Sequence, residues 1–241
     1  MKTLGIIGGI GPESTIDYYR QIISAYRKQK ADGSAPAIII NSVDLHKLLD
    51  WMAAGEGARV AQYLVAAIEK LAAAGADFGV VAANTFHAVF DEVERGSPIP
   101  LISIVVAALD AARELRLKKV GLFGTRFTMQ GKFYSDVFSK AGIALVAPKA
   151  DEQDYIHEKY MSELVKGLFL PQTRESLLGI VNRMKGEERI EGLILGGTEL
   201  PLILRDGDCS GIPFLDTTQL HVKAILSRML AAEEAETAPA L

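Results

Sequence analysis

Phe78-Gly-Val-Val-Ala-Ala-Asn-Thr-Phe-His87 and Gly192-Leu-Ile-Leu-Gly-Gly-Thr-Glu199 are the two stretches that decide the fold. Each is a short apolar run that ends in small residues followed by a threonine. Such a run predicts a buried parallel strand that ends at a functional site, because parallel strands are usually covered on both faces. The near-repetition of the pattern also predicts that the chain is built from two similar halves.

Strand-like and helix-like segments alternate along the whole chain. Strands are predicted at about 4–8, 37–41, 79–83, 101–102, 120–123, 144–146, 193–195 and 213–215. Helices are predicted at about 12–30, 57–74, 85–94, 105–115, 129–141, 152–166, 171–185 and 217–231. This alternation predicts an α/β fold of mainly parallel sheets with helices on both faces.

The duplicated motifs predict two pseudo-symmetric three-layer domains. The expected division is 1–103 plus 214–241 for the first domain and 104–213 for the second. No linker rich in Pro, Gly or Ser separates them, so we expect an active-site cleft between tightly packed halves. Ligands of parallel sheets bind at the carboxyl ends of the strands. Small and polar residues gather at five such ends, near residues 8–12, 41–42, 83–85, 124–125 and 196–198.

Composition excludes several classes of function. The 241 residues include 49% hydrophobic and 23% charged residues and have a net charge of −4, so no basic surface for nucleic acid is expected. Cys209 is the one cysteine, which excludes an internal disulfide, and the four histidines lack the spacing of metal ligands. No apolar run reaches the roughly 20 residues of a membrane helix. We expect a cytoplasmic protein without a metal and without a membrane or nucleic-acid partner.

Several motifs, taken together and in order, resemble the aspartate/glutamate racemase family. They are Gly5-Ile-Ile-Gly-Gly-Ile-Gly-Pro-Glu-Ser-Thr15, Asn84-Thr85 with His87, Gly124-Thr-Arg-Phe-Thr128, Lys166-Gly167, Thr198-Glu-Leu-Pro201, and Asp216-Thr-Thr218 with His221. The resemblance covers nearly the whole chain. It implies two α/β domains, a homodimer, and a small amino acid or dicarboxylate as ligand. It also implies proton transfer at the α-carbon without pyridoxal phosphate or any other cofactor.

The resemblance further implies two catalytic positions, one in each motif, where the family has cysteines. In the family one thiolate removes the α-proton and the opposing thiol reprotonates the other face, which requires two groups of suitable pKa. Here these positions are Ala83 and Gly197. A methyl group and a hydrogen cannot carry a proton, so we expect weak or absent turnover in this chain. Cys209 lies in a turn-like loop and does not match either position.

The titratable groups adjacent to the two vacant positions are Glu199 and His87, which makes them candidate substitute bases. Glu199 also belongs to the ordinary family motif, so its presence needs no new role. The family's enzymes for acidic substrates often have an arginine shortly after the second strand. This chain has Asp44-Leu-His-Lys47 there, so a preference for Asp or Glu is not predicted.

Candidate substrate-binding residues follow from the same motifs: Gly11, Asn84, Thr85, Gly124, Thr125, Thr128, Lys166 and Thr198. Their hydroxyl and backbone N–H groups could hold an α-carboxylate at strand-to-helix turns. An alternative interpretation makes Thr85 and Thr125 helix N-caps, and Lys166 a partner of its helix C-terminus. The glycine-rich start is not a dinucleotide motif, because Ser14 stands where the third glycine belongs.

We therefore expect an amino-acid racemase of the aspartate/glutamate type whose turnover is weak or lost. One alternative is a non-catalytic module that binds an amino acid or dicarboxylate. Another is a related decarboxylase or lyase, although those relatives still need one thiol to protonate the intermediate.

Overall fold

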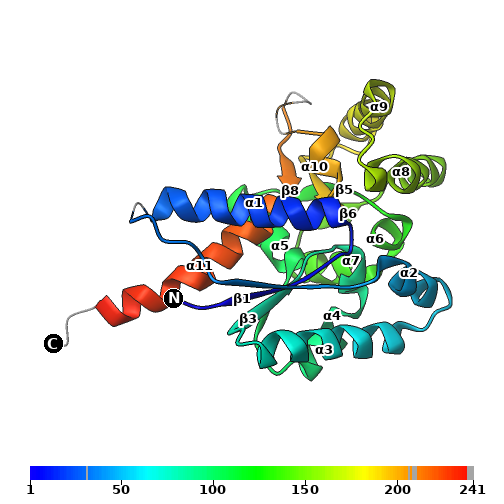
Figure 1. Cartoon of the computed structure of the whole chain (residues 1–241). Coiled ribbons are helices and arrows are strands. Elements are labelled where there is room, and N and C mark those ends of the chain that lie inside the picture. The colour runs from blue at the N-terminus through cyan, green and yellow to red at the C-terminus, as the bar shows by residue number, and fades with distance from the viewer. Residues whose placement is uncertain (31, 206, 208–210, 238–241) are drawn as a thin grey trace. The chain divides into compact units, whose positions relative to one another are not determined.

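Two four-stranded sheets, each made of parallel strands, form the framework of the computed structural model (Figure 1). The structure describes residues 1–30, 32–205, 207 and 211–237. The first sheet has the strand order β2-β1-β3-β4 and the second β6-β5-β7-β8. If the strands of each sheet are numbered separately, both orders read 2-1-3-4, so the two halves share one topology. The predicted α/β fold with two similar halves is confirmed.

Contacts divide the chain into two units. Unit 1 contains Met1–Ala82, Val89–Ser103 and the chain from His221 onward, whereas unit 2 contains Ala83–Ala88 and Ile104–Leu220. The boundary at 214 that we predicted differs from this division. The strand β8 (Phe214–Asp216) pairs with β7 (Gly192–Gly196), so residues 214–220 belong to unit 2.

Unit 1 places helices on both faces of its sheet. Its elements are β1 (Leu4–Gly8), α1 (Pro12–Gln29), β2 (Ile38–Ser42), α2 (Leu45–Ala53), α3 (Gly57–Ala73), β3 (Phe78–Val81), α4 (Phe90–Gly96), β4 (Leu101–Ile102) and most of α11 (Thr217–Thr237). Leu4 and Ile6 pack with α1 and α11. Gly5 faces the other way, where a Cβ would lie 3.0 Å from the Ala76 Cβ just after α3. This alternation follows from the two-residue period of a strand.

Unit 2 repeats this layering. Its elements are η1 (Thr85–Val89), whose last residue lies in unit 1, α5 (Ile104–Glu114), β5 (Lys119–Gly124), α6 (Arg126–Gln130), α7 (Lys132–Lys140), β6 (Ala144–Val146), α8 (Ala150–Ser162), η2 (Leu164–Lys166), α9 (Pro171–Glu187), β7, α10 (Leu200–Ile203), β8 and the first residues of α11. Leu193 and Leu195 pack into the cluster under α8 and α9, and Ile194 packs into the cluster under α5 and α7. The uninterrupted apolar run of β7 is therefore buried on both faces.

Helix α2 was missed by the sequence analysis. The Asp44 carboxylate accepts a hydrogen bond of 2.9 Å from the His46 backbone N–H and caps this helix. The segment that begins at Asp44 is the one where the family often has an arginine, and here the Asp44 carboxylate accepts from the backbone of α2. An N-cap residue ahead of the amphipathic stretch Leu45–Ala53 was the signal that could have predicted the helix.

Three other predicted helices are interrupted. The expected helix at 152–166 is α-helical only as far as Ser162 and is followed by the 3₁₀ turn η2. The segment 85–94 begins as the 3₁₀ turn η1 and becomes α-helical at Phe90. The expected helix at 129–141 is divided at Gly131, which ends α6 and precedes α7. A Cβ on Gly131 would lie 2.5 Å from the Phe127 carbonyl oxygen, so this tight break requires glycine.

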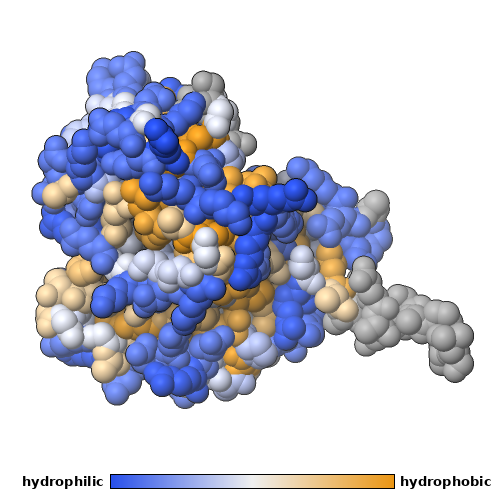
Figure 2. All heavy atoms as spheres, turned by 180° about the vertical axis from the view of Figure 1, so that it is seen from behind, coloured by the Kyte–Doolittle hydropathy of each residue, from blue (hydrophilic) through white to orange (hydrophobic). Residues whose placement is uncertain are grey.

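The surface is mainly hydrophilic, as the composition of the chain predicts. On the face drawn in Figure 2, hydrophilic residues cover most of the surface and hydrophobic residues form smaller areas between them. Ile16 and Tyr19 on α1 are among the large hydrophobic side chains that are exposed. Every helix in the described ranges is too short or too polar to cross a bilayer.

Candidate functional site

Ala83 and Gly197 occupy corresponding places in the two sheets. Ala83 follows β3 and Gly197 directly follows β7, and each of these strands stands third in its sheet order. Both residues are buried. The segment Ala83–Ala88 belongs to unit 2 although β3 belongs to unit 1, so both positions are described within unit 2. Neither position contains a group that can titrate.

Asn84 is held by a buried hydrogen-bond chain that reaches β7. The Tyr134 hydroxyl donates to the Asn84 Oδ1 at 2.6 Å, and the Asn84 Nδ2 donates to the Thr217 Oγ1 at 3.1 Å. The Thr217 hydroxyl in turn donates to the Leu195 carbonyl oxygen at 2.7 Å. Burial raises the pKa of Tyr134 well above its ordinary value, so its phenol remains a donor. The loop at Asn84 is thereby fixed to the strand that leads to Gly197.

Three buried threonines form a second group of hydrogen-bonded side chains next to Asn84 in the sequence and at the start of α6. The Oγ1 atoms of Thr85 and Thr125 are 3.0 Å apart, and that of Thr128 lies 3.4 Å from the first and 3.2 Å from the second. Thr125 also caps α6 by accepting from the Thr128 N–H at 3.3 Å. The capping interpretation is thus correct for Thr125. Each hydroxyl has one hydrogen and two lone pairs, so the cluster retains capacity for a further polar partner.

Gly124 allows two strand ends to approach each other closely. A Cβ there would lie 2.7 Å from the Gly196 carbonyl oxygen and 2.8 Å from the Thr128 Cβ. Such contacts are too short for any side chain, so the close approach of β5 and β7 beside the threonine cluster depends on glycine. Gly124 therefore shapes the cluster.

A second polar cluster lies directly after Gly197. The Tyr160 hydroxyl donates to the Glu199 Oε2, and the Thr198 hydroxyl donates to the same oxygen at 3.0 Å. The three side chains are buried, with 6%, 2% and 4% exposure for Tyr160, Glu199 and Thr198. Burial, followed by the charge of Glu199, raises the pKa of Tyr160 well above its ordinary value. The phenol therefore keeps its proton and acts as the donor.

His87 is engaged at both ring nitrogens. Its Nδ1 lies 2.8 Å from the Ala83 carbonyl oxygen, and its Nε2 accepts from the Ile104 backbone N–H at 3.2 Å. An accepting carbonyl and a donating N–H select the tautomer with the proton on Nδ1. The ring fastens the loop that contains Ala83 to the start of α5. This geometry makes His87 a poor substitute base.

Gly11 and Lys166 are not members of either cluster. Gly11 precedes α1 with a φ of 91°, and its carbonyl oxygen accepts from the Thr15 N–H at 3.1 Å. Lys166 is exposed at the end of η2, next to Gly167 with a φ of 74°. This position is consistent with the interpretation of Lys166 as a residue at a helix end. Within the described residues, neither of the two joins the hydrogen bonds of the threonine or Glu199 clusters.

The site residues that the sequence analysis missed are Tyr134, Tyr160 and Thr217. Tyr134 and Tyr160 lie within helices, so only tertiary packing brings them to the loops, whereas Thr217 directly follows the strand β8. Thr217 had one local signal, since it falls within the Asp216-Thr-Thr218 motif. The prediction about Cys209 lies outside the described residues. The described part of the chain contains no group of three or more His, Cys, Asp or Glu side chains placed to hold a metal ion.

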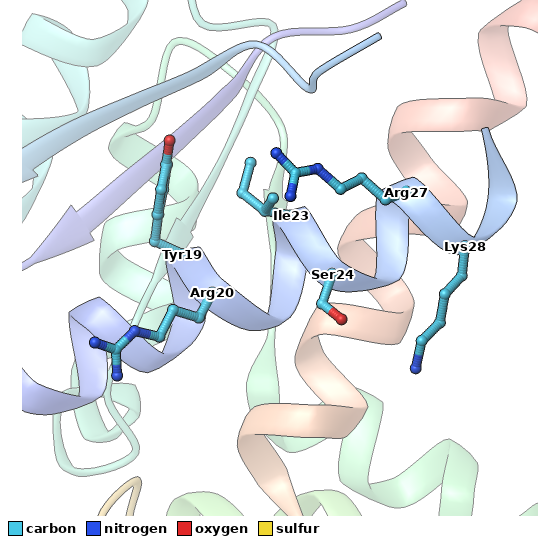
Figure 3. Close-up of a pocket in the computed structure, with 6 residues that line it drawn as sticks. All are labelled: Tyr19, Arg20, Ile23, Ser24, Arg27 and Lys28. Carbon is cyan, nitrogen blue, oxygen red and sulfur yellow. The ribbon is translucent and has the colours of Figure 1, made fainter. Parts of the chain in front are cut away.

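A surface hollow lies along α1 in unit 1. Figure 3 shows its lining, which comes from one helix: Tyr19, Arg20, Ile23, Ser24, Arg27 and Lys28. Tyr19, Ile23 and Arg27 follow one another at four-residue spacing and so share one side of the helix. None of the predicted site residues lines this hollow.

Comparison with known proteins identifies the family. The family description that matches residues 7–225 is Asp/Glu/Hydantoin racemase. A protein from Bacillus subtilis strain 168, the broad specificity amino-acid racemase RacX, is 23% identical over 237 residues, which are 95% of this chain and 98% of the relative.

Solved structures agree. A structure from Yersinia pestis has a TM-score of 0.87 and 33% identity, covering 95% of this chain and 100% of the other. An aspartate racemase homologue from Pyrococcus horikoshii OT3 has a TM-score of 0.82 and 32% identity, covering 95% of this chain and 99% of the other. The fold and the strand-end loops thus define a two-unit α/β protein of the racemase type. The chain belongs to the Asp/Glu/Hydantoin racemase family.

Proposed function

We propose that this chain binds a small amino acid or dicarboxylate at the buried clusters of unit 2, and that its racemisation of the ligand is weak or absent. The observation that carries the proposal is the chemistry of two strand ends. Where the resemblance implies a proton carrier after β3 and another after β7, the chain has a methyl group at Ala83 and a hydrogen at Gly197.

The physical requirement for racemisation is strict. The α-proton of an amino acid is very weakly acidic, so its removal needs a base on one face and an acid on the other, both with suitable pKa values. Ala83 and Gly197 can supply neither. The reaction we propose to be weakened is proton transfer without a cofactor, as in the relatives that the motifs resemble.

Binding depends on groups that the chain retains. The hydroxyls of Thr85, Thr125 and Thr128 lie within 3.4 Å of one another in a buried cluster, and hydroxyl donors suit a carboxylate. Thr198 offers a further hydroxyl beside Gly197. We infer that these groups hold the α-carboxylate. The side chain of the ligand is left open, in keeping with the broad specificity named for the Bacillus subtilis relative.

A second candidate function is one-sided proton exchange by Glu199. It is favoured by the place of this carboxylate, which is buried directly after the vacant position and held by Tyr160 and Thr198. A single base exchanges the α-proton of one enantiomer and returns it to the same face, so the configuration is retained. Racemisation would need a second carrier beside Ala83, where His87 has both nitrogens engaged.

The two functions are separated by one experiment. Purified protein is incubated in D₂O with the L- and D-forms of aspartate and glutamate, and the α-proton signal is followed by NMR while binding is measured by calorimetry. We expect heat of binding with at least one ligand and no inversion of configuration. Loss of the α-proton signal with retained configuration supports Glu199, and Glu199→Gln should then abolish that loss.

The threonine cluster is tested with matched variants. Thr85→Val and Thr125→Val remove a hydroxyl at constant shape and should weaken binding about tenfold each, if each contributes one hydrogen bond to a charged group. Ser24→Ala removes an exposed hydroxyl on α1 in unit 1 and should leave binding unchanged. Rapid racemisation by the unchanged chain, or no heat with any of the four amino acids, succinate or malate, would contradict the proposed function.

A further inference from the structure

The side-chain space of residue 197 is already occupied. A Cβ built on Gly197 would lie 2.5 Å from the Tyr160 Cε2, 2.9 Å from its hydroxyl oxygen and 3.0 Å from its Cζ. Close-packed interiors do not accommodate carbon atoms at such distances. Gly197 is not among the glycines with positive φ, so its backbone conformation is open to any residue. The Tyr160 ring is therefore what restricts this position to glycine.

The Tyr160 ring is held firmly where it is. The ring projects from α8 into the apolar cluster under α8 and α9, and it is buried. Its hydroxyl donates to the Glu199 carboxylate, which is itself 2% exposed. Displacing the ring would remove a donor from a buried charge, which is one of the costlier changes in a protein interior. A side chain at residue 197 therefore cannot simply push Tyr160 aside.

We propose that Tyr160 is a positioning residue that takes the place of a side chain at residue 197 and orients the Glu199 carboxylate beside it. Residues 160 and 197 then form one coupled position. The vacancy at Gly197 is not an empty space but is filled by a phenol that comes from another element. A cysteine at residue 197 is consequently compatible with this chain only if residue 160 is made smaller at the same time.

The coupling is tested by a double-mutant cycle on thermal unfolding. Gly197→Ala is made in the unchanged chain and in Tyr160→Leu, which lacks the ring atoms that crowd residue 197. We expect Gly197→Ala to lower the Tm by roughly 5 °C in the first background, as overpacked cores do, and by less than about 1 °C in the second. Equal shifts in both backgrounds, or no shift in the first, overturn the proposal.

Gly196→Ala provides the matched control for the cycle. A Cβ on Gly196 would lie 2.7 Å from the Leu122 Cδ1 and 2.8 Å from the Phe123 carbonyl oxygen, which do not belong to Tyr160. Its destabilisation should therefore be the same with Tyr160 and with Tyr160→Leu. If Gly196→Ala is also relieved by Tyr160→Leu, the relief is general loosening of the core, and the specific coupling is refuted.

The orienting role is read from the Glu199 carboxyl carbon by ¹³C NMR, with its resonance assigned through Glu199→Gln. Tyr160→Phe keeps the ring but removes the donor, so the Glu199 resonance should move. Tyr155→Phe, on the same helix, should leave it in place. Gly197→Ala should move the resonance as Tyr160→Phe does, because it displaces the ring. Each of these variants carries a single substitution. If the Glu199 resonance does not move in Tyr160→Phe or in Gly197→Ala, the proposal is overturned.

One arm of the test rests on the proposed function. Gly197→Cys with Tyr160→Leu should exchange the α-proton of bound aspartate or glutamate in D₂O at least tenfold faster than Gly197→Cys alone. If the stability cycle shows coupling but neither cysteine variant exchanges any proton, the amino-acid site fails while the role of Tyr160 stands. If Gly197→Cys alone exchanges as fast as the double variant, Tyr160 does not control this position.

Discussion

Thr217 connects two parts of the candidate site through its hydroxyl group. Its hydroxyl accepts from the Asn84 Nδ2 at 3.1 Å and donates to the Leu195 carbonyl oxygen at 2.7 Å. It is the hydrogen-bonded link between the loop after β3 and the strand β7, and it is fully buried. The fixed position of the Asn84 loop therefore depends on a residue at the end of β8, outside the two near-repeated segments.

Replacing this hydroxyl gives the prediction at the residue scale. Thr217→Val keeps the shape but leaves a buried amide N–H of Asn84 without its partner, so unfolding should require about 1–3 kcal/mol less free energy. Urea unfolding measures the change. Ser227→Ala removes an exposed hydroxyl that donates to the Lys223 carbonyl oxygen and should change stability by less than about 0.5 kcal/mol. Equal effects of the two substitutions would contradict this role for Thr217.

The residues that could be predicted from sequence are those whose position is local. Ala83, Asn84 and Gly197 were placed at strand ends because an apolar run stops there, and they do follow β3 and β7. Tyr160 could not be predicted, since it contacts a residue 39 positions away and its helix shows no polar motif at that point. Periodicity indicates which side of a helix is buried but not which buried tyrosine meets a carboxylate.

At the scale of elements, α11 is tied to unit 1 by a histidine rather than by apolar packing alone. The His221 Nδ1 accepts from the Tyr18 hydroxyl of α1 at 2.9 Å, and its Nε2 donates to the Ile102 carbonyl oxygen of β4 at 2.9 Å. Burial lowers the pKa of His221 from 6.5 to about 4, although the Ile102 hydrogen bond opposes this. The ring is therefore neutral in the folded protein at neutral pH.

This neutral histidine predicts a defined pH dependence. The unfolded state takes up a proton near pH 6.5, and the folded state does so only near pH 4, so the stabilisation present above pH 6.5 is lost as the pH falls toward 4. The full loss is roughly 3 kcal/mol. Urea unfolding at about pH 7.5 and pH 4.5 should show a larger loss for the unchanged chain than for His221→Asn, which cannot titrate. An equal loss of stability in the unchanged chain and in His221→Asn would contradict this role of His221.

Elements were predicted well where one pattern dominated. The strands came out within a few residues because each is an apolar run, and α1, α3 and α9 because their periodicity is long. Helix α2 was not predicted, although Asp44 provides an N-cap signal directly ahead of it. The break between α6 and α7 follows from a backbone contact of Gly131, which periodicity does not report.

On the scale of the whole molecule, the two units have one strand order and the two motifs occupy equivalent strands. The sequence near-repeat at residues 78–87 and 192–199 thus reflects a repeated architecture. The assignment of residues to units was less predictable. Residues 83–88 group with unit 2 although their strand lies in unit 1, and this depends on contacts of Asn84, Thr85 and His87 with later parts of the chain.

The family resemblance also predicts the oligomeric state. We expect a homodimer, so light scattering coupled to size-exclusion chromatography should give twice the chain mass of 26.0 kDa. Because association is a mass-action equilibrium, the dimer fraction should fall on dilution. A mass of one chain at all concentrations up to about 100 μM would contradict the dimer.

The order of segments along the chain has a consequence for cutting it. The backbone passes from one unit to the other after residues 82, 88, 103 and 220. No single protease cleavage can therefore release either unit as an intact separate fragment. Severing the link after residue 103, for example, would leave both units assembled from pieces of two polypeptides. A shortened gene that encodes only one unit would have to omit internal stretches and rejoin the remaining ends.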